Sequence, residues 1–277
     1  MPPSSIEKQD AVRALVRSSV ESYALGFKAR HEAERDDPEG TINMKIHNVF
    51  IAVLGPEIQY YTALVRSLDS SLGNMLEGLA MNIARLSFEV HKSVEGSLGM
   101  AQTAGIAALL ERYKRHEKAH EVADYQFLRE RPATGMVTKR HDSDYYLVDR
   151  DHGHHHLIEL KIGGDLDNKK ARSEKEAILE QYAILCNGLG EHDTVRVYFA
   201  TAYNRFGEGR PWRQERVRQF FADEEFLIGR DFWDFVCQDP KGYEVVLEAY
   251  KHNAHLIRRC LEEIRGVYLG ESVYRSE

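Results

Sequence analysis

Cysteine is scarce in this sequence of 277 residues, and long apolar runs are absent. The three cysteines lie far apart and form no CxxC pair, which argues against a disulfide framework and against a zinc ribbon. No apolar run has the length of a bilayer span, and the first residues, MPPSSIEKQD, lack the basic and apolar regions of a signal peptide. We therefore expect a cytoplasmic protein with no membrane partner.

An excess of positive charge is also absent. The chain has 37 lysines and arginines against 44 aspartates and glutamates, a net charge of −7, whereas a nucleic-acid-binding protein is usually basic. The charge is uneven, however, because five arginines lie between Tyr203 and Arg218 with only two glutamates among them. Such a local basic strip can bind phosphate groups on an otherwise acidic protein.

Hydrophobic periodicity and turn residues predict an α/β chain. The predicted elements are, in order, helices over residues 4–30, 57–94 (broken near 70–73) and 107–127, strands over 145–148 and 156–162, a helix over 169–187, a strand over 195–202 and helices over 213–265. Residues 96–105 are predicted to form a Gly-rich loop. This order predicts a mixed sheet with helices on both faces, in a single domain of residues 1–277. Its parts are a mostly helical part (1–130), a hairpin and sheet (131–212) and a helical C-terminal part (213–277).

The predicted strand LIELKI, residues 157–162, carries two opposite charges inside an apolar run. Glu159 and Lys161 share one face of this strand, because residues i and i+2 point the same way. Asp144 begins the preceding strand, so antiparallel pairing would bring it close to Glu159. Two neighbouring carboxylates favour a cation between them, and Mg²⁺ prefers carboxylates, waters and phosphate oxygens. A lysine there can orient or help to deprotonate a water, which suits metal-assisted hydrolysis of a phosphodiester bond.

Nearby residues leave some alternatives open. Asp142 lies two residues before Asp144, and we favour Asp144 because it directly adjoins the apolar run. We expect the histidines at 152 and 154–156 to form a solvated hairpin tip rather than a zinc site, because their spacing suits no common ligand set. On the following helix we expect a mostly solvated row of glutamates, of which Glu180, with Gln181, could face the metal.

The spacing of Asp144 and Glu159-x-Lys161 resembles that of the PD-(D/E)xK nuclease superfamily. Four further segments, in order, resemble the TdeIII-type type II restriction endonucleases: SLDSSLGNMLEGLA, HDSDYYLVD, LIELKIGGDLDNKKARSEKEAILEQY and LIGRDFWDFV. The resemblance implies a restriction-endonuclease-like core with a helical N-terminal part. It also implies Mg²⁺-dependent cleavage of double-stranded DNA at an interrupted GG-any base-CC site. No proline precedes the aspartate here, unlike in the superfamily motif.

The resemblance also implies roles for individual residues. Asp144 and Glu159 would bind the metal, together with the backbone carbonyl of Leu160, and Lys161 would orient the attacking water. Glu77, on an earlier helix, would complete the metal site. The biology of restriction implies a cognate methyltransferase, and a two-fold symmetric DNA site predicts a homodimer.

The residues expected to contact DNA flank this predicted catalytic hairpin. Arginine can bind guanine through two hydrogen bonds in the major groove, and lysine can bind phosphates. The expected DNA-binding residues are Lys169, Lys170, Asn204, Arg205, Arg210 and Arg213. Two alternatives have the same fold: a repair or defence nuclease without sequence specificity, and a catalytically silent DNA-binding module.

Overall fold

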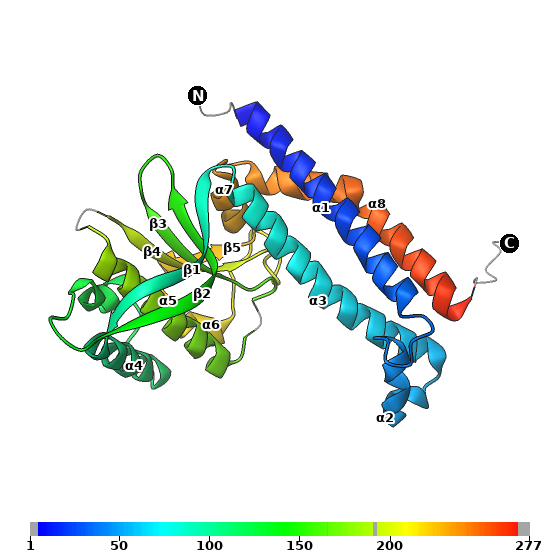
Figure 1. Ribbon diagram of the computed structural model, residues 1–277, viewed down its shortest axis with the longest axis horizontal. Coiled ribbons are helices and arrows are strands. Elements are labelled where there is room, and N and C mark those ends of the chain that lie inside the picture. Colours follow the sequence, from blue (N-terminus) through cyan, green and yellow to red (C-terminus); the bar gives the residue numbers. More distant parts are fainter. Residues whose placement is uncertain (1–4, 165, 191–192, 271–277) are drawn as a thin grey trace. The chain divides into compact units, whose positions relative to one another are not determined.

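The computed structural model describes residues 5–164, 166–190 and 193–270 (Figure 1). The chain forms two compact units. A helical unit contains residues 1–79 and 244–277, and a sheet unit contains residues 80–243. The internal boundaries predicted from the sequence, at residues 130 and 212, both fall inside the sheet unit. Ser4, the expected first residue of the N-terminal helix, lies outside the described residues.

The helical unit is formed by α1 (Ser5–Ala33), η1 (Asn43–His47), α2 (Val49–Ala52) and most of α3 (Pro56–Ala84) and α8 (Gly242–Leu269). Lys28 of α1 pairs with Glu263 of α8 at 2.7 Å, and the Tyr23 hydroxyl lies 3.0 Å from that of Ser71 on α3. The predicted break near residues 70–73 is wrong, because α3 is continuous there. The Ser71 hydroxyl donates to the carbonyl of Ser67, one turn earlier, so the serine is accommodated inside the helix.

The sheet unit contains a five-stranded mixed sheet in the order β1 (Phe88–Gly99), β2 (Met136–Asp149), β3 (His155–Leu160), β4 (Val195–Thr201) and β5 (Phe226–Ile228). The pairs β1–β2 and β2–β3 are antiparallel, whereas β3–β4 and β4–β5 are parallel. Helix α5 (Asn168–Gly188) connects the parallel strands β3 and β4 (Figure 1). The predicted mixed sheet with flanking helices is therefore confirmed.

Strand β1 was not expected from the sequence. The prediction of helix up to residue 94 and of a loop over 96–105 is wrong, because β1 leads directly into α4 (Met100–Lys114). The strand is stabilised by antiparallel pairing with residues about fifty positions later in the chain, which local periodicity does not reveal. Gly96 serves close packing rather than a turn, since a Cβ there would lie 2.8 Å from a methyl carbon of Ile184 on α5.

The C-terminal third of the sheet unit, predicted to be mostly helical, also contains a strand. It contains α6 (Glu215–Arg218), η3 (Asp223–Glu225), strand β5 and α7 (Arg230–Cys237). Helix α7 packs on the face of the sheet opposite α5, where the Phe235 ring centre lies 5.4 Å from that of Phe88 and 5.6 Å from that of Tyr198. Phe232 and Trp233 are buried in the core.

Two histidines of the expected solvated hairpin tip are in fact buried. His155 and His156 open β3, which is paired on both sides, so their side chains lie on two covered faces of the sheet. His156 packs against Phe88 and Phe235, and burial lowers its pKa to about 4. It is therefore neutral at pH 7. Only His152, in the turn, has the expected exposure.

A buried ion pair connects α5 to the segment before β5. The Lys175 ammonium donates to the Glu225 carboxylate at 2.5 Å, and the Tyr125 hydroxyl from η2 (Val122–Arg129) donates to the same oxygen at 2.8 Å. The other Glu225 oxygen accepts from the backbone nitrogen of Ala222 at 2.7 Å. Lys175 is 1% exposed, so both charges depend on each other for neutralisation.

We predict that Glu225→Ala lowers the free energy of unfolding of the protein by about 3–5 kcal/mol, because the substitution leaves the Lys175 ammonium buried without a counter-charge. Urea denaturation followed by circular dichroism measures the loss. Asp223→Ala is the matched control, since Asp223 lies two residues away and pairs with Arg218 at the surface. The control is expected to cost less than about 1 kcal/mol. Equal losses in the two variants would contradict the prediction.

Candidate active site

Strands β2 and β3 bring Asp144 and Glu159 to neighbouring positions. Tyr145 pairs with Ile158 in the antiparallel ladder, so the next two positions outward are Asp144 and Glu159. The Asp144 carboxylate accepts a hydrogen bond of 3.2 Å from the backbone nitrogen of Leu160, which holds it over the end of β3. The juxtaposition expected from the hairpin is therefore present.

A β-bulge in β2 separates the two candidate aspartates. His91 of β1 stands opposite Tyr146 and Ser93 opposite Asp142, so three residues of β2, 143–145, face the single residue between them on β1. A bulge of this kind re-aims the side chains next to it. Before the bulge, His141 points toward α5, where it lies 2.9 Å from Glu180, and the adjacent Asp142 is therefore on the opposite face. After the bulge, Asp144 faces the α5 side.

Three carboxylates surround the Lys161 ammonium. Lys161 makes a close ion pair with Glu159, and its ammonium nitrogen lies 3.3 Å from a Glu174 oxygen and 3.9 Å from an Asp144 oxygen. These carboxylates come from β3, α5 and β2 respectively. Glu159 is nearly buried, with 12% of its side chain exposed, whereas Asp144 is 41% exposed. The group thus has a buried end and an open end.

The environment shifts the pKa values of the central pair. Burial, reinforced by the charge of Asp144, raises the pKa of Glu159 to about 8. Burial lowers the pKa of Lys161, but the surrounding carboxylates outweigh it, so that this pKa lies above the ordinary lysine value. Lys161 is therefore protonated at neutral pH and can donate hydrogen bonds.

The oxygen-rich donor set fits a hard divalent cation. Three carboxylates share one ammonium, which leaves an excess of negative charge at the open end beside Asp144. Over residues 5–164, 166–190 and 193–270, no group of three or more His, Cys, Asp or Glu side chains is arranged to hold a metal ion. Asp144 and Glu159 alone would therefore hold a cation through two carboxylates, and Mg²⁺ is commonly bound in that way, with waters and phosphate oxygens as its other ligands.

Two other expected metal ligands stay predictions. Leu160 lies between Glu159 and Lys161 with its side chain buried, and its backbone nitrogen donates a hydrogen bond to Asp144. Glu77 lies on α3, in the helical unit.

Glu174 belongs to this group of charges, although the sequence analysis assigned it to a solvated face. It precedes the buried Ile178 by four residues, so a helical count from the apolar side of α5 would have placed it over the sheet. Glu180, expected as a possible metal neighbour, instead accepts hydrogen bonds from Lys139 at 2.9 and 3.0 Å. Gln181 is buried within α5.

The expected DNA-binding residues border the same end of the sheet. The backbone nitrogen of Ala202 donates to the carbonyl of Ile162, so the loop after β4 starts beside the end of β3. A Cβ on Gly163 would lie 2.7 Å from the Tyr203 hydroxyl, and a Cβ on Gly164 would lie 3.0 Å from Trp212. Both ends of the 203–212 loop therefore contact the turn that follows Lys161.

In this region the arginine side chains are exposed to solvent, whereas the asparagine side chain makes hydrogen bonds within the loop. Arg205, Arg210 and the following Arg213 are exposed. The Asn204 side chain donates to the Arg210 carbonyl at 2.7 Å and accepts from the Phe206 nitrogen at 3.0 Å, so it shapes the loop. Lys169 and Lys170 are exposed on the first turn of α5.

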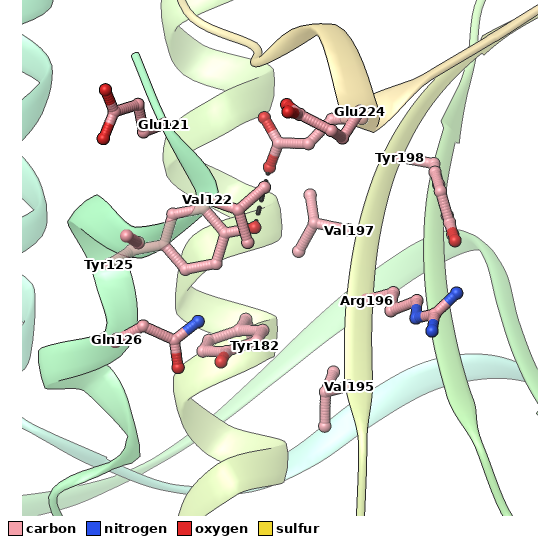
Figure 2. Close-up of a pocket in the computed structure, with 12 residues that line it drawn as sticks. Glu121, Val122, Tyr125, Gln126, Tyr182, Val195, Arg196, Val197, Tyr198 and Glu224 are labelled. Carbon is pink, nitrogen blue, oxygen red and sulfur yellow. Dashed lines mark hydrogen bonds between the residues drawn. The ribbon is translucent and has the colours of Figure 1, made fainter.

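A pocket of about 550 Å³ lies elsewhere, between η2, α5 and the edge of β4 (Figure 2). Tyr125, Tyr182 and Val197 line it together with the acidic side chains of Glu121 and Glu224. None of the Asp144–Glu159–Lys161 group lines this pocket, and its acidic residues would repel phosphate groups. The Asp144–Glu159–Lys161 group lies instead at the end of β3, where Asp144 is open to solvent.

Comparison with known families agrees with this geometry. A family model described as "Type II restriction endonuclease, HinfI" matches residues 8–253, most of the chain. The chain belongs to the HinfI family of type II restriction endonucleases. No curated protein sequence matches it. Membership of the HinfI family implies a nuclease that acts on DNA, so the restriction-endonuclease resemblance is confirmed at this level. The TdeIII-type specificity stays a prediction.

In the described part of the chain, no helix is long and apolar enough to cross a membrane.

For this HinfI-family protein we predict that Asp144→Asn abolishes DNA cleavage, whereas Asp142→Asn keeps activity within a few-fold of the unchanged protein. The reason is that the β2 bulge directs only Asp144 toward Glu159 and Lys161. Cleavage of a mixed-sequence plasmid in Mg²⁺, resolved on a gel, measures both variants. Loss of cleavage in Asp142→Asn, with cleavage retained in Asp144→Asn, would show that the assigned aspartate is wrong.

Proposed function

We propose that the protein is a Mg²⁺-dependent type II restriction endonuclease that hydrolyses phosphodiester bonds in double-stranded DNA at a specific sequence. The observation that carries the proposal is the open-ended group of Asp144, Glu159 and Lys161 in a chain of the HinfI family. These three residues are the proposed catalytic set.

Asp144 and Glu159 would hold the metal, with the Leu160 carbonyl and Glu77 as further proposed ligands. Bound there, Mg²⁺ supplies Lewis-acid stabilisation of the phosphate and lowers the pKa of a bound water. The hydrogen bond from the Leu160 nitrogen keeps the Asp144 carboxylate aimed at this position before substrate binds. Glu159, whose pKa is raised without a cation, is ionised more readily when a positive charge lies beside it.

Lys161 would orient the attacking water and donate a hydrogen bond to the scissile phosphate. Its raised pKa supports this role, because a protonated ammonium is a donor throughout the neutral range. Glu174, 3.3 Å from the ammonium, is a positioning residue that limits where the lysine can point.

The 203–212 loop and the first turn of α5 are the proposed DNA-contacting surfaces. Contact of the loop with Gly163 and Gly164 supports this, because it puts Arg205, Arg210 and Arg213 near the chemistry. Lys169 and Lys170 would bind phosphates on the other side of the same turn. Asn204 contributes by holding the loop conformation.

The finer specificity rests on the TdeIII-type resemblance alone. An interrupted GG-any base-CC palindrome is the proposed recognition site, a homodimer the proposed assembly and a methyltransferase of the same specificity the proposed companion enzyme. Two other functions have the same site: a nuclease without sequence preference, and a silent DNA-binding module.

Digestion of a plasmid of known sequence separates these functions. We predict discrete fragments in Mg²⁺ and no cleavage in EDTA, and sequencing of the fragment ends gives the recognition site directly. A smear would indicate a nuclease without specificity, and a mobility shift without cutting would indicate a silent binding module. Glu159→Ala and Lys161→Ala should abolish cleavage while DNA affinity stays within a few-fold, because most affinity comes from phosphate contacts elsewhere.

Glu176→Ala is the matched control for these variants, since Glu176 lies on α5 two residues from Glu174 and makes no contact with Lys161 in the described ion pairs. It should cleave like the unchanged protein. Cleavage within a few-fold of normal in Glu159→Ala or Lys161→Ala would refute the catalytic assignment.

Recognition by the 203–212 loop gives a separate prediction. Arg205→Ala or Arg210→Ala should cost about 1–3 kcal/mol of binding at one base pair and relax discrimination at that position, if the arginine contacts a guanine. A phosphate contact would instead weaken all sequences alike and lower the salt slope by about one unit. Binding to cognate and single-mismatch duplexes at two salt concentrations measures both effects. Arg13→Ala, which removes one charge on α1, is the control. Unchanged binding in both loop variants would contradict the prediction and would indicate that Lys169 and Lys170, rather than the loop, contact DNA.

A further inference from the structure

The exposed hydrophobic side chains of this protein are concentrated in one short segment. Of the sixteen large hydrophobic side chains that are exposed in the described part of the chain, nine lie between residues 44 and 65. Six of them belong to η1, α2 and the residues that join α2 to α3: Met44, Ile46, Val49, Phe50, Val53 and Leu54. Phe50 and Val53 are the most exposed, at 82% and 80%. We call residues 44–65 the apolar segment.

Helix α3 extends the same surface. Ile58, Tyr61 and Val65 are spaced by three and four residues, so they form a stripe along one side of α3, and each is 38–50% exposed. Tyr60 and Leu64 lie on the other side of the helix and are buried in the helical unit. The first turns of α3 therefore have two apolar sides, of which one is already covered. A helix that is apolar on both sides is normally covered on both.

The amount of exposed surface suits a protein interface. With about 150–200 Å² for a fully exposed side chain of this size, the nine side chains present roughly 900 Å². Each partner in a standard protein–protein interface buries about 800 Å², whereas a monomer rarely exposes a contiguous apolar patch of more than a few hundred Å². Only Lys45 and Glu57 carry full charges in the apolar segment. A helix that lies on a membrane surface is usually rich in lysine and arginine, so the composition favours a protein partner.

We propose that the apolar segment is the surface through which two copies of this chain form a dimer. The choice of a second copy as partner rests on the proposed cleavage of both DNA strands, because the described residues of one chain provide one Asp144–Glu159–Lys161 group. In a two-fold symmetric dimer the same patch faces itself, and an apolar patch with few charges is complementary to its own copy. The helical unit then serves assembly, and the sheet unit serves chemistry.

The double variant Phe50→Glu/Val53→Glu tests the proposal. Both side chains are exposed, so the folded chain tolerates carboxylates there, whereas a symmetric interface would bury four of them without partners. We expect light scattering with size-exclusion chromatography to give twice 31.8 kDa for the unchanged protein and 31.8 kDa for the variant at the same concentration. The dissociation constant of the dimer should rise at least about 100-fold. Circular dichroism should show unchanged helix content.

Leu25→Glu is the matched control, because Leu25 is 70% exposed on α1 of the same unit but lies outside the apolar segment. It should remain dimeric. An unchanged protein that is monomeric at every concentration, or a double variant that stays dimeric, would overturn the proposal. These masses are measured without DNA, so a dimer that fails to cut plasmid would refute the proposed nuclease function alone, and a monomer that cuts would refute the dimer alone.

Discussion

The carboxyl group of Glu159, near the end of a strand that is paired on both sides, is the constraint on which the Asp144–Glu159–Lys161 group depends. Burial raises the pKa of this carboxyl to about 8, so the ionised form needs positive charge beside it. Lys161, two residues later on the same face, supplies part of that charge. Asp144 on β2 and Glu174 on α5 add two further carboxylates around Lys161, so the group as a whole has an excess of negative charge. This excess of negative charge favours a divalent cation beside Asp144.

The surrounding fold keeps these groups in place. Helix α5 carries Glu174, and one residue later Lys175 is fixed by its buried pair with Glu225. A shift of α5 along the sheet would therefore move Glu174 away from Lys161 and break the buried Lys175–Glu225 ion pair at the same time. On the other side, the bulge in β2 aims Asp144 toward α5, and the bond to the Leu160 nitrogen holds it there. The position of Asp144 is thus fixed by the backbone of β2 and β3, and the position of Glu174 is fixed by the buried ion pair of the adjacent Lys175.

The two compact units differ in the surface that they present. The sheet unit has its charged group and its arginine loop at one end of β3 and β4, where a long polyanion can approach without entering a closed pocket. The helical unit has the apolar segment, with two charged residues over its 22 positions. Basic side chains are thus concentrated on the surface proposed to contact DNA, and charged side chains are few on the surface proposed to contact another protein. A chain of negative net charge can bind DNA in this way.

The sequence by itself determined the β2–β3 hairpin and the face that Glu159 and Lys161 share, because alternation with a period of two is a local pattern. It also determined α5, from its helical periodicity, and β4, from its run of β-branched and aromatic residues. The tertiary structure alone decided β1, whose pairing partner is about fifty residues away, and the bulge that distinguishes Asp144 from Asp142. It also decided the burial of His155 and His156 and the place of Glu174, because these depend on which strand or helix lies across from them. Local periodicity shows which side of an element is apolar, but contacts between distant segments decide which residues pack against that side.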